Sequence, residues 1–154
     1  MATTISSGTN PYKLGSPPDF GTLYSGRALE FDGVVDYFNV GKSPINIFDG
    51  GGTISAWIKA ESDGGSDTAR IFSKRSSGLG WFCNVSHDSG SAMKMNFNVE
   101  FGGTDGAYIT TNLDVIRSTW HHLVITYDSS GAGSSYRPTI YIDGVSKTLT
   151  ITAN

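Results

Sequence analysis

The chain has 154 residues and a net charge of −3, with 11 lysines and arginines against 14 aspartates and glutamates. The basic residues are scattered, so the sequence lacks the positive patch that binds nucleic acid, and nucleic acid is not an expected partner. No stretch approaches the roughly 20 apolar residues of a membrane span. A single cysteine excludes an intrachain disulfide.

The first part of the chain, residues 1–26, is expected to form an extended arm. Its glycines and prolines stand at Gly8, Pro11, Gly15, Pro17, Pro18, Gly21 and Gly26. The segment shows neither the alternation of a strand nor the apolar spacing of a helix, so no regular structure is predicted. It also lacks the basic start and apolar run of a secretory signal, which predicts a protein made and kept in the cytoplasm.

The remaining residues, 27–154, are predicted to form one domain of short strands. Alternating apolar and polar side chains place these strands near residues 27–31, 36–40, 53–60, 69–74, 80–87, 92–100, 106–112, 119–127, 139–143 and 147–152. Twenty glycines supply turns, and helix formers are few. A strand every 8 to 12 residues or so is typical of an antiparallel β-sandwich, so the predicted fold class is all-β.

Strand alternation also predicts the two faces of each strand, because successive side chains point to opposite sides. The inward set is Ile54, Ala56, Ile58, Trp81, Cys83, Val85, Met93, Met95, Phe97, Val99, Leu123, Ile125 and Tyr127. The opposite set includes Trp57, Phe82, Asn84, Asn96, Asn98, Trp120, His122 and Tyr141. Asp143-Gly144 is predicted to be a two-residue hairpin turn.

Four segments carry a recurring pattern in chain order. They are Ala-Leu-Glu-Phe-Asp-Gly-Val-Val-Asp-Tyr at 28–37, Thr-Ile-Ser-Ala-Trp-Ile-Lys at 53–59, Trp-His-His-Leu-Val-Ile-Thr-Tyr-Asp at 120–128 and Tyr-Ile-Asp-Gly at 141–144. In these segments the chain resembles the laminin G-like, concanavalin A-like jelly-roll family, with Gly52 where the family usually has phenylalanine. The resemblance implies a jelly-roll sandwich. It leaves function open, because the fold serves lectins, adhesion modules, glycosidases and virion proteins alike.

The outward side chains suggest glycan binding. Planar amides beside aromatic rings suit a sugar, whose hydroxyls need hydrogen-bond partners and whose C–H faces stack on rings. The predicted ligand contacts are Phe82, Asn84, Asn96, Asn98 and Tyr108. The alternative for the asparagines is structural, since an exposed strand face needs polar residues anyway. Loops 61–68, 86–91 and 101–107 are further candidates, whereas Trp57, Trp120 and His122 fall on family motif positions and are expected to pack structurally.

Catalysis is not expected. Glycosidases that share this fold carry a Glu-x-Asp-x-Glu strand, which sets the acid and the nucleophile about 5 to 5.5 Å apart. Glu30 and Asp32 begin that spacing, but Val34 and Val35 stand where the second glutamate should fall. No serine-hydrolase or paired-histidine motif is present, so a laminarinase-like glycosidase is the least favoured alternative.

Calcium is the one cofactor that the sequence suggests. Aspartates are frequent in the predicted loops, where carboxylates and carbonyls suit a hard cation. The family resemblance places Asp32 and Gly33 in a segment that often lies near such a site, and so implies them as metal residues. Aspartate is also a common turn residue, which is the alternative.

The chain departs from the family at its C-terminus. Relatives continue past the Asp-Gly hairpin into further strands, whereas this sequence stops at Asn154, so two or more strands are expected to be missing. An unfilled sheet edge exposes unpaired N–H and C=O groups, which predicts completion by other copies of the chain or by other proteins. The N-terminal arm is the expected exchanged strand.

Together these features predict a noncatalytic surface-recognition or structural protein. Its expected setting is a bacteriophage virion, as a capsid-decoration or tail-fibre component that binds glycans. It would be made in the host cytoplasm and assembled with copies of itself or other virion proteins. The alternative is a carbohydrate-binding module of an extracellular multidomain protein, which a flanking signal peptide or catalytic domain would reveal.

Overall fold

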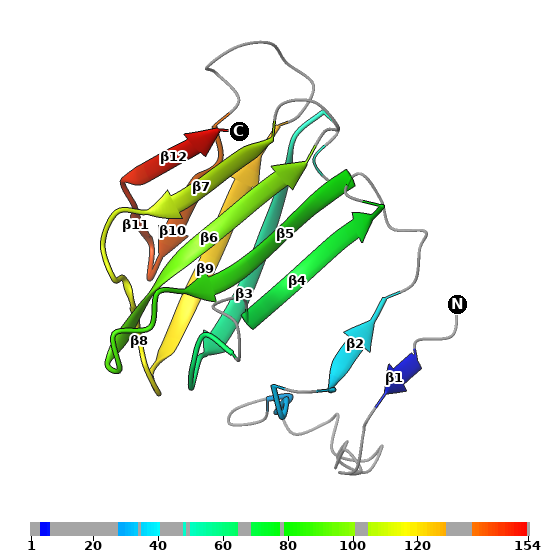
Figure 1. Ribbon diagram of the computed structural model, residues 1–154, viewed down its shortest axis with the longest axis vertical. Helices are drawn as coiled ribbons and strands as arrows, with labels where there is room; N and C mark the ends of the chain where they lie inside the picture. Colours follow the sequence, from blue (N-terminus) through cyan, green and yellow to red (C-terminus); the bar gives the residue numbers. More distant parts are fainter. Residues whose placement is uncertain are drawn as a thin grey trace. The chain divides into compact units, whose positions relative to one another are not determined.

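The computed structural model describes residues 4–6, 28–33, 35–40, 48, 50–64, 69–77, 79–100, 105–128 and 137–153. These ranges contain twelve β-strands and no helix, which confirms the all-β prediction (Figure 1). None of this part of the chain therefore forms a helix that could span a membrane. The chain divides into two compact units, Met1–Ile45 and Asn46–Asn154.

The first unit contains a two-stranded antiparallel sheet. Strand β1 (Thr4–Ser6) pairs with β2 (Tyr37–Asn39) through the partners Thr4 and Asn39, Ile5 and Phe38, and Ser6 and Tyr37. Strand β2 confirms the strand expected near 36–40. Strand β1 lies in the arm, for which the sequence predicts no strand; most of the arm falls outside the described residues.

The strand predicted at 27–31 is wrong, because residues 28–31 lie outside any strand. The chain turns directly after them. Asp32 Oδ1 accepts the backbone N–H of Val35 at 2.9 Å and that of Asp36 at 3.1 Å, and Gly33 adopts a φ of +72°. Leu29 and Phe31 are 45% and 47% exposed, so the apolar alternation that predicted a strand is not matched by burial.

The second unit consists of two antiparallel sheets. The four-stranded sheet has the order β11 (Val145–Ser146), β10 (Thr139–Ile142), β9 (Trp120–Tyr127), β3 (Gly52–Lys59). The six-stranded sheet has the order β12 (Leu149–Ala153), β7 (Gly106–Thr110), β6 (Ala92–Glu100), β5 (Leu79–Ser86), β4 (Ala69–Ser76), and β8 (Val115–Ile116) pairs with one end of β6. In Figure 1 the two sheets form two layers, which confirms the sandwich.

The core lies between the two layers and follows the predicted alternation. Its buried members are Phe48, Cys83, Val85, Met93, Met95, Phe97, Val99, Val115, Leu123, Ile125, Tyr127, Ile140 and Ile142. Burying each large apolar side chain stabilises the fold by about 1.5–3 kcal/mol relative to exposure. Phe48, which sequence patterning did not assign to the core, packs edge-on against Trp81, Phe97 and Tyr127, with ring centroids 5.0, 5.5 and 5.6 Å apart.

Two local features set the strand register. Asp143 and Gly144 adopt φ values of 55° and 77°, as a type I′ turn requires, and connect Ile142 directly to its partner Val145. This confirms the predicted hairpin turn. In β4 a bulge between Arg70 and Phe72 shifts the pairing with β5 by one residue. A bulge reverses the facing of every residue that follows it.

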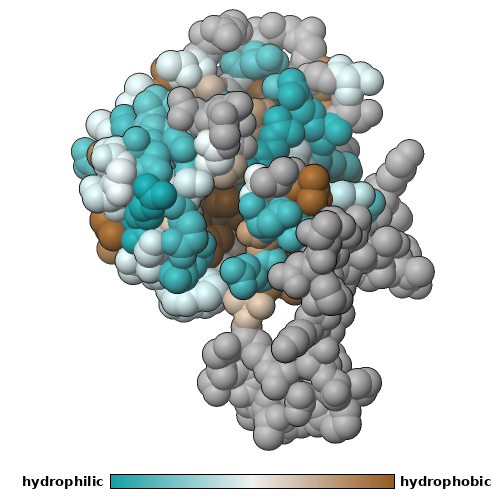
Figure 2. Space-filling view, turned by 60° about the horizontal axis from the view of Figure 1, so that its bottom comes forward, coloured by the Kyte–Doolittle hydropathy of each residue, from teal (hydrophilic) through white to brown (hydrophobic). Residues whose placement is uncertain are grey.

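In the described part of the chain, β3 is an edge strand of the four-stranded sheet and β4 is an edge strand of the six-stranded sheet. The inward side chains of β3, including Ile54 and Ile58, are only half-buried although they pack against the core. Figure 2 shows hydrophobic atoms recessed between two mainly hydrophilic surfaces. The described residues therefore leave part of the apolar interior uncovered.

Candidate functional site

Four of the five predicted ligand contacts share the outer face of the six-stranded sheet. Phe82 pairs with Asn98, and Asn84 pairs with Asn96, across strands β5 and β6. These side chains point away from the core because their strand neighbours, Cys83 among them, point into it. We call this outer surface the polar face; its members are Arg70, Arg75, Phe82, Asn84, Ser86, Asn96, Asn98 and Glu100.

Asn84 and Asn96 form the floor of the polar face. Asn84 is only 2% exposed, and its Nδ2 donates to the backbone oxygen of Val85 at 3.2 Å. Asn96 Nδ2 donates to Ser86 Oγ at 2.8 Å. Asn98 Nδ2 makes a longer bond, 3.4 Å, to Asn84 Oδ1. Asn84 is thus bonded through both ends of its amide, whereas Asn96 Oδ1 is buried without a partner among the described residues. Asn98 makes the longest of the three bonds, so its amide is the one best able to turn to a ligand.

Two arginines cover Phe82. The guanidinium carbon of Arg70 lies 4.5 Å from the centroid of the Phe82 ring, and that of Arg75 lies 5.7 Å from it. Arg75 Nε also forms an ion pair with Glu100 Oε2. The bulge in β4 is what brings both arginines to one face, since strict alternation would put positions 70 and 75 on opposite sides.

A pocket of about 140 Å³ opens at one end of the polar face. It is lined by Asn98, Val99, Glu100, Asp105, Gly106, Ala107 and Thr152. The lining brings together an amide, two carboxylates and a hydroxyl, which can both donate to and accept from small hydroxyl groups. The volume is below the roughly 300–1,000 Å³ of an enclosing ligand site, so a bound group would sit in it only partly.

Tyr108, the fifth predicted contact, faces the other way. It pairs with Phe97 in the core-facing register, is half-buried and packs against the core. Its ring crosses Gly106: a Cβ placed there would lie 2.8 Å from Tyr108 Cε2. Tyr108 therefore packs against Gly106, which lines the pocket, and does not lie on the same face as the asparagines.

The predicted metal residues lie in the first unit. Asp32 carries the turn described above, and Asp36 Oδ2 accepts the Asp32 N–H at 3.2 Å. Within the described ranges, no three His, Cys, Asp or Glu side chains gather closely enough to hold a metal ion. Calcium binding at Asp32 and Gly33 stays a prediction.

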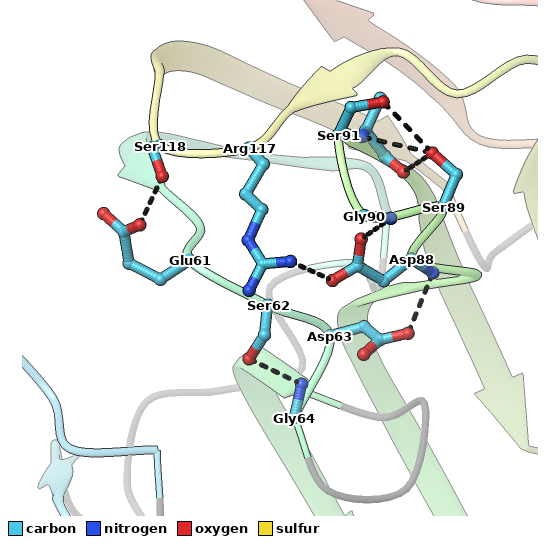
Figure 3. Close-up of polar contacts among 11 residues, drawn as sticks. Glu61, Ser62, Asp63, Gly64, Asp88, Ser89, Gly90, Ser91, Arg117 and Ser118 are labelled. Carbon is cyan, nitrogen blue, oxygen red and sulfur yellow. Dashed lines mark hydrogen bonds and ion pairs between the residues drawn. The ribbon is translucent and has the colours of Figure 1, made fainter.

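Figure 3 shows residues of two candidate loops, 61–68 and 86–91, close to one another and to Arg117 and Ser118. Asp63, which is 8% exposed, accepts the backbone N–H of Asp88 at 2.9 Å, and Asp88 forms an ion pair with Arg117 at 3.3 Å. Ser118 donates to Glu61, and this bond together with Lys59 lowers the pKa of the Glu61 carboxyl. These polar groups bind one another, so the cluster joins the two loops to the connection between β8 and β9. Residues 65–68 of the first of these loops lie outside the described residues.

Several members of the site were not among the sequence-predicted contacts. Glu100 continues the alternation of Asn96 and Asn98, so that alternation could have identified it. Arg70 and Arg75 could not be found this way, because their common facing depends on the bulge. Thr152 reaches the pocket only because β12 pairs with β7, a long-range contact that no local pattern encodes.

Comparison with known protein families gives a match over most of the chain. Residues 32–152 match the family model described as the concanavalin A-like lectin/glucanases superfamily. Neither the curated proteins nor the solved structures that were searched gave a match. The family match covers most of the chain and agrees with the two-sheet sandwich described above. The chain therefore belongs to the concanavalin A-like lectin/glucanase superfamily.

Proposed function

We propose that this protein is a noncatalytic carbohydrate-recognition domain that binds its glycan on the polar face. The observation that supports this best is the position of Asn98. Its amide lies between the arginine-covered Phe82 and the pocket that Glu100, Asp105 and Thr152 line. A superfamily of lectins and glucanases is consistent with this activity.

The chemistry of the polar face suits sugar hydroxyls. Each hydroxyl both donates and accepts, and the pocket offers carboxylates that accept and an amide and a hydroxyl that do both. Arg70 adds a planar set of donors, and among the described residues no carboxylate pairs with it. The pocket is small, so one or two hydroxyls would enter it while the rest of the saccharide lies along the face.

The same geometry argues against hydrolysis. A glycosidase needs one carboxylic acid to protonate the leaving oxygen and a second carboxylate across the scissile bond. Glu100 Oε2 is engaged by Arg75, so this oxygen is not free to face a leaving group. Incubation with β-glucans should release no product. Hydrolysis that disappears in Glu100→Gln or Glu30→Gln would show that the domain is an enzyme.

A glycan array followed by calorimetry tests the binding site. We expect Asn98→Ala to weaken binding of any glycan that scores on the array by about threefold to tenfold, the worth of one hydrogen bond. Asn112→Ala is the matched control, because Asn112 is exposed in the loop between β7 and β8. Wild-type silence across the array would favour a purely architectural role.

We also propose a setting, a bacteriophage virion in which the domain assembles with other chains. Two observations support a multichain setting. Among the described strands, β3 and β4 are edge strands of their sheets, and the inward Ile54 and Ile58 of β3 are only half-buried. Mass spectrometry of purified phage particles should detect the chain. Its detection only within a secreted multidomain protein would support the extracellular carbohydrate-binding module instead.

A further inference from the structure

The outer face of the four-stranded sheet carries two exposed tryptophans. Trp57 on β3 is 67% exposed and Trp120 on β9 is 48% exposed. The register places Trp57 opposite His122, two residues along β9 from Trp120, so both indoles stand on the same face of adjacent strands. The family motif led us to expect structural packing at these positions, and the exposure of both indoles is therefore informative.

The Trp57 indole is held in place although it is exposed. Its ring centroid lies 5.1 Å from that of His122, and the two ring planes are tilted by only 32°. His122 is held in turn, because its Nε2 lies 2.8 Å from Ser55 Oγ and its backbone N–H donates to Asp143 Oδ1 at 2.9 Å. An aromatic ring fixed before binding loses little conformational freedom when a ligand arrives, and this favours affinity.

We propose that Trp57, Trp120 and His122 form a second saccharide-binding surface, which takes pyranose rings by stacking. The ligand class follows from the surroundings. The residues beside the indoles on β3 are Ser55 and Lys59, and Lys59 pairs with Glu61 at 3.0 Å. The next outward residues, Val124 on β9 and Tyr141 on β10, add one aliphatic side chain and one phenol, so polar groups form most of the border of the two rings. A pyranose matches it, with an apolar C–H face for the indole and hydroxyls for the polar border.

The spacing of the indoles favours an oligosaccharide over a single sugar. Trp57 and Trp120 are diagonal neighbours on paired strands, and such side chains start about 7–8 Å apart. That separation allows one saccharide chain to contact both rings with different sugar units. The surface belongs to a different sheet from the polar face, so this proposal does not depend on glycan binding there.

Tryptophan fluorescence provides a direct test, because the chain has three tryptophans and the third, Trp81, packs against the core. Cellohexaose, laminarihexaose and chitohexaose are titrated separately against the full chain. At least one should change the emission and protect it from iodide quenching. Trp57→Ala should weaken the binding of that hexasaccharide by about threefold to tenfold, and Trp120→Ala should weaken it by a similar factor.

Further variants test whether the emission change reports binding at the two indoles and not at the polar face. Val145→Ala, a 59%-exposed position on the opposite edge of the same sheet, should leave binding unchanged. His122→Ala should weaken binding and increase the mobility of Trp57, measured by fluorescence anisotropy in a Trp120→Phe background. Asn98→Ala should not affect the fluorescence titration. No emission change with any of the three hexasaccharides, or full binding by Trp57→Ala, would overturn the proposal.

Discussion

The side chain of Asp143 links the β10–β11 turn to strand β9. Its Oδ2 lies 2.6 Å from Nδ1 of the buried His121, and its Oδ1 accepts the His122 N–H. His121 Nε2 accepts the backbone N–H of Ile116 at 2.9 Å, so Nδ1 is the ring nitrogen that donates to Asp143. The β10–β11 turn is thereby connected to β9 and, through His121, to β8.

Asp143→Asn should destabilise the protein at neutral pH. An asparagine accepts the φ of 55° at this position, so the turn itself is preserved. The charge that strengthens the bond to His121 is lost. Because Asp143 is about half exposed, we expect the free energy of unfolding to fall by only about 1 kcal/mol, measured by urea denaturation at pH 7.

The effect of Asp143→Asn should depend on pH in one direction. The hydrogen bond from His121, and next the His122 N–H, lower the pKa of the Asp143 carboxyl in the folded protein. A group with a lowered folded pKa contributes stability above its unfolded pKa and loses it as the pH falls. The free energies of unfolding of wild type and variant should therefore show their full difference above about pH 5. The two values should converge as the pH falls below the ordinary aspartate pKa of about 3.9. A constant difference down to pH 2.5 or so would contradict this assignment.

At the scale of elements, the β4–β5 hairpin depends on Gly80. Gly80 has a φ of +125°, and a Cβ built there would lie 2.0 Å from the backbone oxygen of Lys74. Gly80→Ala forces the two strands apart, so the free energy of unfolding, measured by urea denaturation, should fall by about 2–4 kcal/mol.

Gly90→Ala is the matched control for that loss. Gly90 also has a positive φ, +88°, but a Cβ there would meet nothing within 4 Å. Only the conformational strain remains, and we expect it to lower the free energy of unfolding by about 1–2 kcal/mol. Equal losses in the two variants would show that the contact with Lys74 is unimportant.

Most of the strands could be predicted because they are long and alternate regularly. Strand β6 matches its expected range, 92–100, and its inward methionines are fully buried. Strands β8 and β11 were not predicted, since two residues are too few to show a period. At 28–31 the alternation is present but the strand is absent, because a strand needs a partner as well as a pattern.

The candidate site was less predictable than the fold. Alternation correctly grouped Phe82, Asn84, Asn96 and Asn98 on one face, but it cannot say that Asn84 is only 2% exposed there. Tyr108 was predicted as a contact together with the loops at one end of the sandwich, and its pairing with Phe97 turns it toward the core. Pockets and exposed indoles arise from contacts between distant strands, which local sequence does not encode.

The whole sandwich encloses its single thiol. Cys83 is fully buried, its Sγ lies 3.3 Å from Met95 Sδ, and burial raises the pKa of the thiol. A thiol reagent should therefore react with Cys83 only when the two sheets separate. Its labelling rate should rise with urea in parallel with the fraction unfolded, and Cys83→Ala should show no signal. Labelling of native protein as fast as that of a free cysteine would contradict a closed core.

The two layers also determine what a single molecule could do with its outer surfaces. The polar face and the tryptophan surface look away from each other, and their sheets pack about 10 Å apart. One saccharide chain could not span both surfaces without wrapping around an edge. Two chains held on opposite sides would be cross-linked by a monomer, so soluble polysaccharide would gel or precipitate without any oligomer of the protein.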